Sequence, residues 1–518
     1  MSKSESYVYD AGGNLTLFRD RKLQATTYIY DALNRRTQAT YADGSTTVYT
    51  YDKGNRLTQI NDSIAGNIVR TYDALERLTS EQTPQGTVSY TYDKASRRET
   101  MTVPGQSSIS YTYDNANRLT QITQGTSVVQ FGYDTANRRT SLTLPNGIVV
   151  EYGYDAASRL TSITYIQNGT TVIGDLTYEY DKAGNRTKTS GSWARTGMPE
   201  AITTTSYDAG NRQLTFGDKT LAYDDNGNLQ SITDSNGTTL YQWNARNQLG
   251  GISGPDVNAS FVYDGAGRRE KKTINGTLTE FLYDGLNPVQ ETSGTTVLAN
   301  ILPGLDIDEF LSRTDVVTGA TSNFLTDALG SAVAVTDNTG AVQIEYTYEP
   351  FGRSTANGAP NSNSFQYTGR ENDGTGLYYY RARFYHPGLQ RFLSEDPLFS
   401  PHLIATDPAN KDLLAYIGNI EAQVSSRVFV DSTNAYLYVN NKPLTLTDPT
   451  GLRSCCKEKP RTVIEDCPEW YCRRVTFGYP AYICVRVCIC YEVQCDEKSN
   501  FRACVFMRFM VPQPDPNA

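Results

Sequence analysis

The pair Tyr-Asp recurs along this chain at a nearly constant interval, and that period constrains the fold more than any other feature. Between Asp10 and Asp155 the successive pairs are 21, 21, 21, 20, 21, 20 and 21 residues apart. A fixed period of this size indicates one supersecondary unit stacked many times. The pairs end at Asp10, Asp31, Asp52, Asp73, Asp93, Asp114, Asp134, Asp155, Asp181, Asp208, Asp224, Asp264 and Asp284, and Trp243-Asn244 stands in one gap as a degenerate copy.

One repeat unit predicts two short strands and two turns. Bulky and small polar residues alternate over Ile109–Tyr113, which is typical of a strand with one buried face. Asp114 can accept hydrogen bonds from the backbone two residues on, and Asn117 tolerates the left-handed conformation, so a turn follows and the return strand starts at Arg118. Such a hairpin cannot bury its apolar face alone, because its edges stay unpaired. We therefore predict an all-β fold: one long, spiralling antiparallel sheet.

The repeated Tyr and Asp residues are expected to be structural. Thirteen similar pairs cannot be thirteen active sites. A tyrosine supplies a large ring for burial and a hydroxyl that can reach a partner, while the aspartate supplies the turn.

Size and charge narrow the class of protein. The 518 residues carry a net charge of −9 with no basic stripe, which argues against nucleic-acid binding by the repeats. No run of 18 apolar residues occurs, so no transmembrane segment is expected. The first residues lack an apolar signal segment and enter a repeat almost at once, so export would not use an ordinary signal peptide.

Cysteine usage changes abruptly near residue 453. All nine cysteines lie in the last 64 residues, and the preceding 454 residues have none. The segments Ala481–Tyr491 and Arg502–Met510 have the composition of strands, so we predict a small Cys-rich C-terminal β domain stapled by disulfides. An odd number of cysteines leaves at least one thiol free or paired with another chain. Zinc bound by cysteines alone is the weaker alternative, because no tight Cys-x-x-Cys pair occurs.

Histidine is nearly absent from the chain. The C-terminal segment has none. The usual active sites of zinc deaminases, His-dependent nucleases and Cys-His proteases contain a histidine, so these three chemistries are excluded for this segment. His386 and His402 are the two histidines present, and no motif supports a catalytic role for either.

Downstream of the repeats, a set of motifs makes the chain similar to a known family. These motifs are Tyr346-Thr-Tyr-Glu-Pro-Phe-Gly-Arg353, Phe365-Gln-Tyr-Thr-Gly-Arg-Glu-Asn-Asp-Gly-Thr-Gly-Leu-Tyr-Tyr-Tyr-Arg-Ala-Arg-Phe-Tyr385, Gln390-Arg-Phe-Leu-Ser-Glu-Asp-Pro397, Asn434-Ala-Tyr-Leu-Tyr-Val-Asn-Asn-Lys-Pro-Leu444 and Asp448-Pro-Thr-Gly-Leu452. With the repeats, they resemble Rhs/YD-repeat proteins that carry an Rhs repeat-associated core, such as polymorphic-toxin Rhs proteins, teneurins and the C components of insecticidal toxin complexes. The resemblance covers residues 1–452.

The resemblance implies three regions and a function. Residues 1–345 would be YD/Rhs repeats that wind into the wall of a hollow shell or half-shell, 346–452 the Rhs repeat-associated core, and 453–518 a variable tip that is a toxin or effector. A shell closes off sheet edges and gives a harmful or unfolded cargo a protected interior. The implied function is encapsulation and delivery of the tip, by a protein that is secreted or at the cell surface.

The resemblance also implies an aspartyl autoprotease that cuts only its own chain. By motif, its catalytic residues are Asp396, Asp448 and Arg383, and the cut falls between Leu452 and Arg453. Two carboxylates held close cannot both ionise easily, so one keeps a proton and polarises the scissile carbonyl while the other activates water. Arg383 would hold the pair in place or stabilise developing negative charge. No cofactor and no metal is expected.

Two features of the core differ from the family pattern. The first aspartate motif lacks its usual glycine, and an insertion of roughly residues 399–432 separates the two motifs. The cost of loop closure grows slowly with length, so the aspartates can still meet in space. The alternative is that Asp396 and Asp448 are only turn residues that precede prolines.

The binding partners that we expect depend on which of two functions the protein has. A cargo shell would hold its own C-terminal tip and would need a shell-closing partner or delivery machinery, and an immunity protein if the tip is toxic. The alternative is a non-enzymatic cell-surface or adhesion protein whose repeats bind a carbohydrate or a neighbouring cell. A chain that divides into two tightly associated fragments favours the first function, and a chain that stays intact favours the second.

Overall fold

The molecule is built mainly from two long antiparallel sheets. This computed structural model describes residues 4–199, 201–202, 204–359, 362–397, 435–438 and 448, and the backbone of 457–458, 484–496 and 499–510. The first sheet has 18 strands and the second has 16, and in each of them every strand pairs with the next along the chain. The described part contains no α-helix, as the repeat pattern predicts.

The first sheet spans residues 6–190. Its strands are β1 (Ser6–Tyr9), β2 (Leu15–Arg19), β3 (Ala25–Tyr30), β4 (Arg36–Thr40), β5 (Thr46–Tyr51), β6 (Leu57–Asp62), β7 (Gly66–Tyr72), β8 (Leu78–Thr83), β9 (Gly86–Tyr92), β10 (Arg98–Thr102), β11 (Ile109–Tyr113), β12 (Leu119–Gln124), β13 (Ser127–Tyr133), β14 (Arg139–Thr143), β15 (Val149–Tyr154), β16 (Leu160–Gln167), β17 (Thr171–Tyr180) and β18 (Arg186–Ser190).

The second sheet spans residues 205–358. Its strands are β19 (Thr205–Tyr207), β20 (Gln213–Phe216), β21 (Lys219–Tyr223), β22 (Leu229–Asp234), β23 (Gly237–Trp243), β24 (Leu249–Ser253), β25 (Asn258–Tyr263), β26 (Arg269–Ile274), β27 (Thr277–Asp284), β28 (Asn287–Ser293), β29 (Thr296–Pro303), β30 (Phe310–Asp315), β31 (Thr321–Thr326), β32 (Ala332–Thr336), β33 (Val342–Tyr348) and β34 (Ser354–Gly358).

The repeat unit folds as its sequence predicts. Along β11, buried and exposed residues alternate, and β12 begins at Leu119, one residue after the predicted start of the return strand. Asp114 Oδ1 accepts the backbone N–H groups of Ala116 and Arg118 at 2.9 and 3.0 Å, and Asn117 has a φ of 62°. The backbone and side chain of Arg118 hold the pKa of Asp114 below its ordinary value.

In most repeats, the tyrosine hydroxyl ties the repeat to the preceding one. The hydroxyl of Tyr113 donates to the carbonyl of Arg98 at 2.9 Å, and that of Tyr133 donates to the carbonyl of Leu119 at 2.9 Å. The degenerate copy keeps this bond, because the indole N–H of Trp243 donates to the carbonyl of Leu229 at 2.8 Å. The same bond recurs at Tyr30, Tyr51, Tyr72, Tyr92, Tyr154, Tyr180, Tyr263, Tyr283 and Tyr348.

In most repeats, an arginine at the end of the turn ties the repeat to the following one. Arg118 Nε donates to Asp114 Oδ2 at 2.7 Å, while its Nη1 reaches the carbonyl of Asp134 in the next repeat at 2.9 Å. Its guanidinium also lies 4.9 Å from the ring centroid of Tyr133. One turn therefore orders the next, which explains why the period is so regular.

The wall breaks between β18 and β19, so it consists of two sheets and not one continuous sheet. In the connecting segment, the Trp193 side chain covers Gly174, where a Cβ atom would lie 2.3 Å from the indole. The Trp193 N–H also donates to Glu345 in β33 at 3.0 Å. Trp193 thus packs on Gly174 of β17 and on the ring of Tyr165 in β16, and it reaches β33 at the point where the chain leaves the first sheet.

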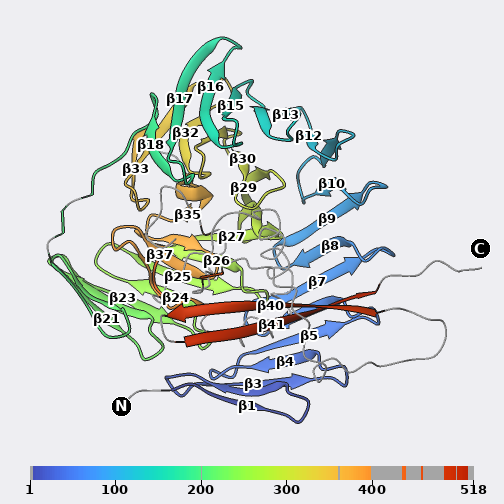
Figure 1. Cartoon of the computed structure of the whole chain (residues 1–518), viewed down its shortest axis with the longest axis vertical. Helices are drawn as coiled ribbons and strands as arrows, with labels where there is room; N and C mark the ends of the chain where they lie inside the picture. The colour runs from blue at the N-terminus through green and yellow to red at the C-terminus, as the bar shows by residue number, and fades with distance from the viewer. Residues whose placement is uncertain are drawn as a thin grey trace, which may run out of the picture.

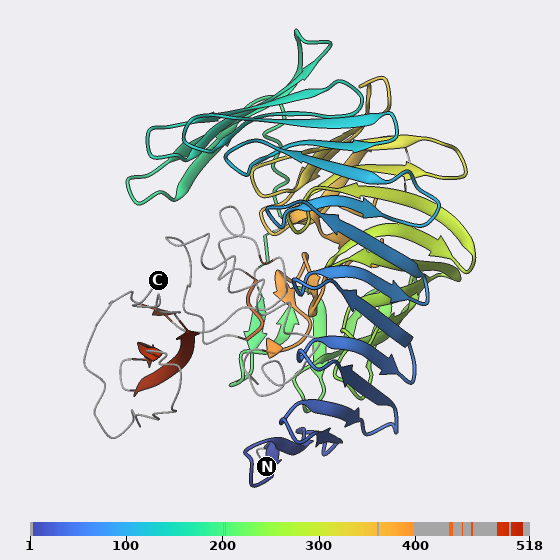
Figure 2. The same ribbon diagram turned by 90° about the vertical axis from the view of Figure 1, so that its right-hand side faces the viewer.

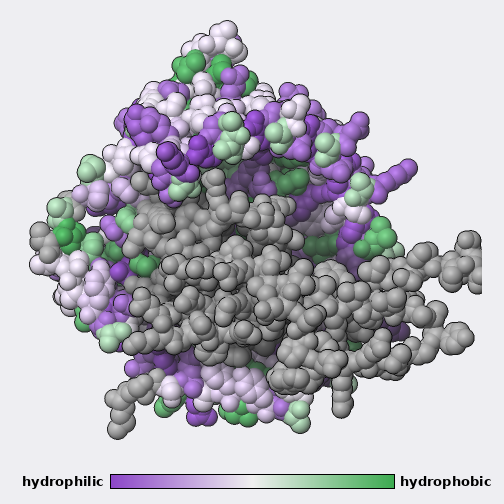
Figure 3. Space-filling model, in the orientation of Figure 1, coloured by the Kyte–Doolittle hydropathy of each residue, from purple (hydrophilic) through white to green (hydrophobic). Residues whose placement is uncertain are grey.

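The two sheets lie against each other and curve around a concave side (Figures 1 and 2). The buried face of β9–β17 packs on Leu282, Leu302 and Leu325 of the second sheet. Ion pairs join the sheets at intervals: Asp62–Arg246 at 2.6 Å, Glu81–Arg268 at 2.7 Å, Arg98–Asp284 at 2.5 Å and Arg139–Glu309 at 2.5 Å. On the face in Figure 3, hydrophilic residues predominate on the wall and hydrophobic ones form small groups.

The concave side of the wall holds a small four-stranded sheet (Figure 2). Its strands are β35 (Glu371–Asn372), β36 (Tyr378–Tyr380), β37 (Arg383–His386) and β38 (Arg391–Phe392), and it is preceded by a 3₁₀ turn, η1 (Tyr367–Gly369). Its apolar residues Leu377, Tyr379 and Phe384 share a cluster with Ile252 and Phe261 of the second sheet. This core sheet therefore rests on the wall.

The C-terminal segment contributes β39 (Lys457–Glu458), β40 (Cys484–Asp496) and β41 (Ser499–Met510). The last two pair as an antiparallel hairpin whose register places Cys490 opposite Cys504. The disulfide staple and the domain boundary near 453 stay predictions. No helix in the described residues is long and apolar enough to cross a membrane.

Candidate functional site

Arg383 occupies a fixed, buried position at the start of β37. A two-residue turn precedes it, and Arg381 takes the left-handed conformation there with a φ of 59°. The Arg383 guanidinium carbon lies 3.6 Å from the ring centroid of Phe392 on β38, and the side chain is 1% exposed. A guanidinium that is stacked and buried in this way has its direction set before any partner binds.

Both predicted aspartates meet this guanidinium. Nη2 of Arg383 lies 2.9 Å from Oδ2 of Asp396 and 3.3 Å from Oδ2 of Asp448. The two carboxylates are 3% and 2% exposed. Because one nitrogen contacts both oxygens, the carboxylates are neighbours although 52 residues separate them in the chain.

The backbone of the closing motif completes the cluster. The carbonyl of Ala435 accepts a hydrogen bond from Arg383 Nη1 at 3.1 Å and another from the Asp396 N–H at 3.1 Å. The inserted residues thus do not keep the two motifs apart. Leu452 and Arg453, the predicted cleavage residues, lie outside the described residues.

An aromatic cluster surrounds the charged groups, and the sequence did not indicate its role. Tyr438 packs on Tyr385 with ring centroids 4.4 Å apart and on Phe392 at 5.8 Å. Its hydroxyl lies 2.9 Å from that of Tyr380. Phe392 and Tyr438 both belong to the motifs that carry the family resemblance, so those motifs were the available signal. Buried rings lower the local dielectric and strengthen interactions between the charges beside them.

His386 is the last residue of the same strand but takes no part in the cluster. Its Nδ1 accepts the N–H of Leu389 at 3.1 Å. Burial lowers the pKa of His386 to about 4, so the ring is neutral at neutral pH. The structure thus gives it a backbone-capping contact, as expected for a structural histidine. His402 lies outside the described residues.

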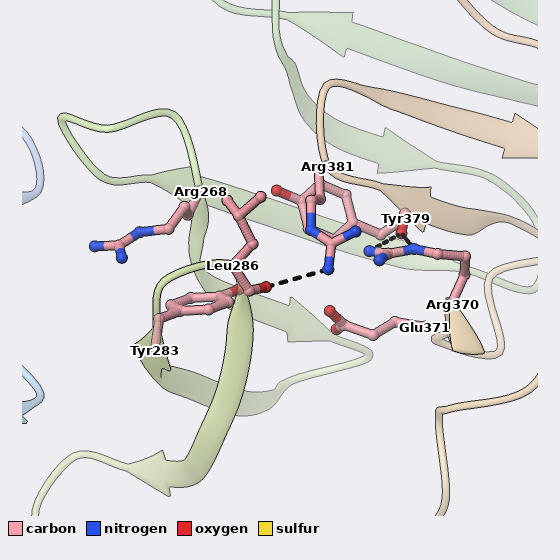
Figure 4. A pocket seen from close by; sticks show the side chains of 7 residues that line it. All are labelled: Arg268, Tyr283, Leu286, Arg370, Glu371, Tyr379 and Arg381. Atoms are coloured by element: carbon pink, nitrogen blue, oxygen red, sulfur yellow. Dashed lines mark hydrogen bonds between the residues drawn. The ribbon is translucent and has the colours of Figure 1, made fainter. Parts of the chain in front are cut away.

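A second charged network fastens the core sheet to the wall, and Figure 4 shows two of its arginines, Arg370 and Arg381, beside Leu286 of the wall. Arg370 and Arg381 both pair with Asp308 in the loop before β30, and Arg381 also donates to the carbonyl of Leu286 at 3.3 Å. Burial alone would raise the pKa of Asp308, but the two guanidiniums outweigh it and hold the pKa below its ordinary value. Arg383 is therefore carried on a sheet that cannot shift freely against the wall.

Two carboxylates beside one guanidinium, shielded from water, can divide the roles of general acid and general base. Among the residues with described side chains, no group of three or more His, Cys, Asp or Glu could hold a metal ion.

Comparison with known proteins agrees with the repeat, the wall and the core sheet. The model of the teneurin YD-shell family matches residues 42–124, 64–170 and 148–419, and that of the RHS repeat matches 9–46. The chain belongs to the YD-shell family. A YD-shell fold is also what the solved structures indicate: TcdB2-TccC3 without its hypervariable C-terminal region aligns with 86% of this chain and 28% of that one, at a TM-score of 0.56 and 18% identity.

Three curated relatives are similar to part of this chain. The tRNA3(Ser)-specific nuclease WapA of Bacillus spizizenii is 30% identical over 53% of the chain. The double-stranded DNA deaminase toxin A of Burkholderia cenocepacia is 28% identical over 37%, and toxin subunit YenC1 of Yersinia entomophaga is 28% identical over 24%. The chain spans only 11%, 16% and 10% of their respective lengths.

Proposed function

We propose that this protein is an Rhs-type shell that encloses its own C-terminal segment as a toxin or effector and releases it by cutting its own chain after Leu452. The observation that carries the proposal is the convergence of Asp396 and Asp448 on the buried guanidinium of Arg383. Turn residues that merely precede prolines would have no reason to share one buried arginine from a third segment. The relatives named for nuclease, deaminase and toxin activities support a toxic cargo.

The proposed reaction is hydrolysis of one peptide bond. One carboxylate of the pair takes a proton from water, and the resulting hydroxide attacks the carbonyl carbon of Leu452. The other carboxyl donates its proton as the C–N bond breaks, so that Leu452 ends as a carboxylate and Arg453 as a new N-terminal amine. Arg383 stabilises the negative charge that develops. Burial of both carboxylates against one guanidinium supports this division, because a second uncompensated negative charge would be costly there.

The proposal extends to partners and place of action. The shell would hold residues 453–518 after cleavage and would meet a shell-closing partner or delivery machinery, and an immunity protein would protect the producing cell. We propose that it acts after secretion or at the cell surface.

The decisive experiment follows the full chain as it is made. Cell-free synthesis with samples taken over time should give two fragments that co-purify, and N-terminal sequencing of the smaller one should begin at Arg453. Asp396→Asn and Asp448→Asn should each leave the chain intact, because either change removes one member of the acid–base pair. Asp407→Asn alters another Asp-Pro pair and is the matched control, which should be cut at the wild-type rate.

Two outcomes would overturn the proposal. A wild-type chain that stays whole under all conditions would favour the adhesion hypothesis. Cleavage of both Asn variants at the wild-type rate would show that the aspartates are only turn residues.

A further inference from the structure

Three segments that are far apart in the sequence meet next to Asp396. They are the turn between β2 and β3 (residues 20–24), the turn between β21 and β22 (residues 224–228) and the core segment that contains Glu395. The first belongs to the N-terminal end of the wall and the second to the start of the second sheet. Their meeting point is thus where the two sheets and the core come together.

Arg21 makes the central contact of this junction. Its Nη1 donates to Glu395 Oε1 at 3.1 Å, and its Nη2 donates to Glu395 Oε2 at 2.6 Å. Nη2 also donates to the backbone carbonyl of Asn226 at 2.6 Å. A two-pronged contact to a carboxylate fixes both the position and the rotation of that carboxylate. Glu395 is the residue before Asp396, so its orientation is coupled to that of the catalytic candidate through one peptide unit.

The second sheet supports Glu395 from the other side. The hydroxyl of Tyr436 donates to the carbonyl of Gly227 at 2.7 Å and lies 3.2 Å from Glu395 Oε1. Gly227 has a φ of +82°, and a Cβ atom there would lie 2.4 Å from Glu395 Oε1 and 2.5 Å from the Tyr436 oxygen. The N–H of Leu229 donates to the carbonyl of Leu393 at 2.7 Å. The segment that carries Asp396 is therefore held in place by contacts with both sheets.

We infer that Arg21 is a positioning residue for self-cleavage, which makes the cut depend on closure of the wall. In this inference, which rests on the proposed function, Asp396 reaches its place beside Arg383 only after the N-terminal repeats have come round to meet the second sheet. The geometry gives the reason, since the residue that orients Glu395 lies 374 positions earlier in the chain. An unfinished wall would leave the cargo attached, and a finished wall would release it into an enclosed space.

The test compares cleavage rates of full-length variants in cell-free synthesis, measured as the fraction of chain cut over time. Arg21→Ala should slow cleavage on the order of 10- to 100-fold, because small misplacement of a reacting group has effects of this size. Arg21→Lys, which keeps the charge but loses the two-pronged contact, should give an intermediate rate. Arg139→Ala breaks a comparable pair with Glu309 elsewhere between the sheets and should cut at the wild-type rate.

A glycine pair tests the same junction without removing a charge. Gly227→Ala should slow cleavage because the new methyl group would collide with Glu395 and Tyr436. Gly267→Ala is the matched control, since Gly267 has nearly the same φ of +81° and nothing lies within 4 Å of the added Cβ. Both substitutions strain the backbone alike, so a difference between them reports the contact alone.

The outcomes separate this inference from the function on which it rests. Absence of cleavage in the wild type would remove the proposed function itself. Normal cleavage of Arg21→Ala in a wild type that does cut would overturn the positioning role alone. Equal slowing by Arg21→Ala and Arg139→Ala would also overturn it, because the effect would then reflect general loosening of the wall. If Arg21→Ala and Glu395→Ala combined are no slower than the slower single variant, the two residues act as one unit.

Discussion

The wall and the core use the same side chains in opposite ways. In the wall, an arginine pairs with the aspartate four residues before it, and the two side chains of the Arg118–Asp114 pair stay 26% and 25% exposed. In the core, Arg383 pairs with aspartates from two other segments, and none of the three is more than 3% exposed. The turn contact of the wall is local and repeated, while this core contact joins segments far apart in the sequence.

This difference indicates where substitutions should matter. A repeated, half-exposed ion pair contributes little on its own, because water already satisfies both charges. A buried group that pairs with several charges cannot be removed without leaving them uncompensated. The same residue types therefore support a tolerant scaffold in one region and a sensitive site in the other.

The largest contrast should appear in the proposed self-cleavage. Arg383→Ala should lower the cleavage rate at least about 100-fold, because in the proposed reaction this guanidinium stabilises the developing negative charge. Arg118→Ala in the wall should change the rate by less than about twofold, since its pair is exposed and repeated. Gel time courses of the two variants measure this, with far-UV circular dichroism to show that both remain folded. Similar cleavage rates for the two variants would contradict the expected difference between the wall and the core.

The next contrast concerns how firmly the core sheet is attached. Arg269 is fully buried, pairs with Glu371 and Asp373 and lies over the ring of Tyr379 at 4.4 Å. Arg269→Ala should destabilise the contact by about 3–5 kcal/mol, because the buried Glu371 would lose this ion pair and the buried Asp373 would keep only Lys272. Amide hydrogen exchange across β35–β37 should accelerate accordingly. Arg159→Ala in the wall should cost about 1 kcal/mol or less, and equal effects would argue against a special core network.

Low pH tests a buried ion pair between the two sheets of the wall. Burial would raise the pKa of Glu81, but Arg268 and Arg70 lower it to about 2. A carboxylate whose pKa is lowered in the folded state stabilises that state. Its contribution is complete when the pH is above the ordinary pKa of 4.5, and it is lost as the pH falls from 4.5 toward 2. The loss should be on the order of 2–3 kcal/mol. Thermal midpoints of wild type and Glu81→Gln should differ at pH 7 and converge near pH 2, and a constant difference would contradict the assigned pKa.

The smallest effect should come from one tyrosine bond of the wall. Tyr113→Phe removes the hydroxyl that reaches the carbonyl of Arg98 and should cost about 0.5–1.5 kcal/mol. Tyr241→Phe is the matched control, because Tyr241 is buried and its hydroxyl makes no hydrogen bond within the described part of the chain. Thermal midpoints measure both. An equal or larger loss for Tyr241→Phe would show that the hydrogen bond to the preceding repeat is not what the hydroxyl of Tyr113 contributes.

The local structure of the wall could be predicted because it depends on neighbours in the sequence. Alternation fixed the buried face of Ile109–Tyr113, and the side chain of Asp114 set the turn. The role of Arg118 was missed, although an arginine four residues after the Asp recurs in most repeats and was visible. The ion pairs between the sheets could not be predicted, because Arg98 and Asp284 are 186 residues apart and meet only through the curvature of two sheets.

The candidate site, too, could be predicted only in part. Motif resemblance selected Arg383, Asp396 and Asp448, and the structure brings all three together. No sequence motif pointed to Arg21, because Arg21 contacts its partner Glu395 only once the wall has curved round. A motif can report which residues meet within a core, but it does not report what holds that core in place from outside.

The tyrosine bond between repeats has a direction that matters while the chain is being made. Each ring reaches back to a carbonyl 14 to 20 residues earlier, as in Tyr133 with Leu119 and Tyr180 with Leu160. A hairpin that leaves the ribosome therefore finds its acceptor already in place on the finished edge behind it. The tyrosine bonds themselves therefore need no segment that has yet to be translated and can form in step with synthesis, whereas the arginine contacts to the following repeat and the packing of the two sheets are completed later.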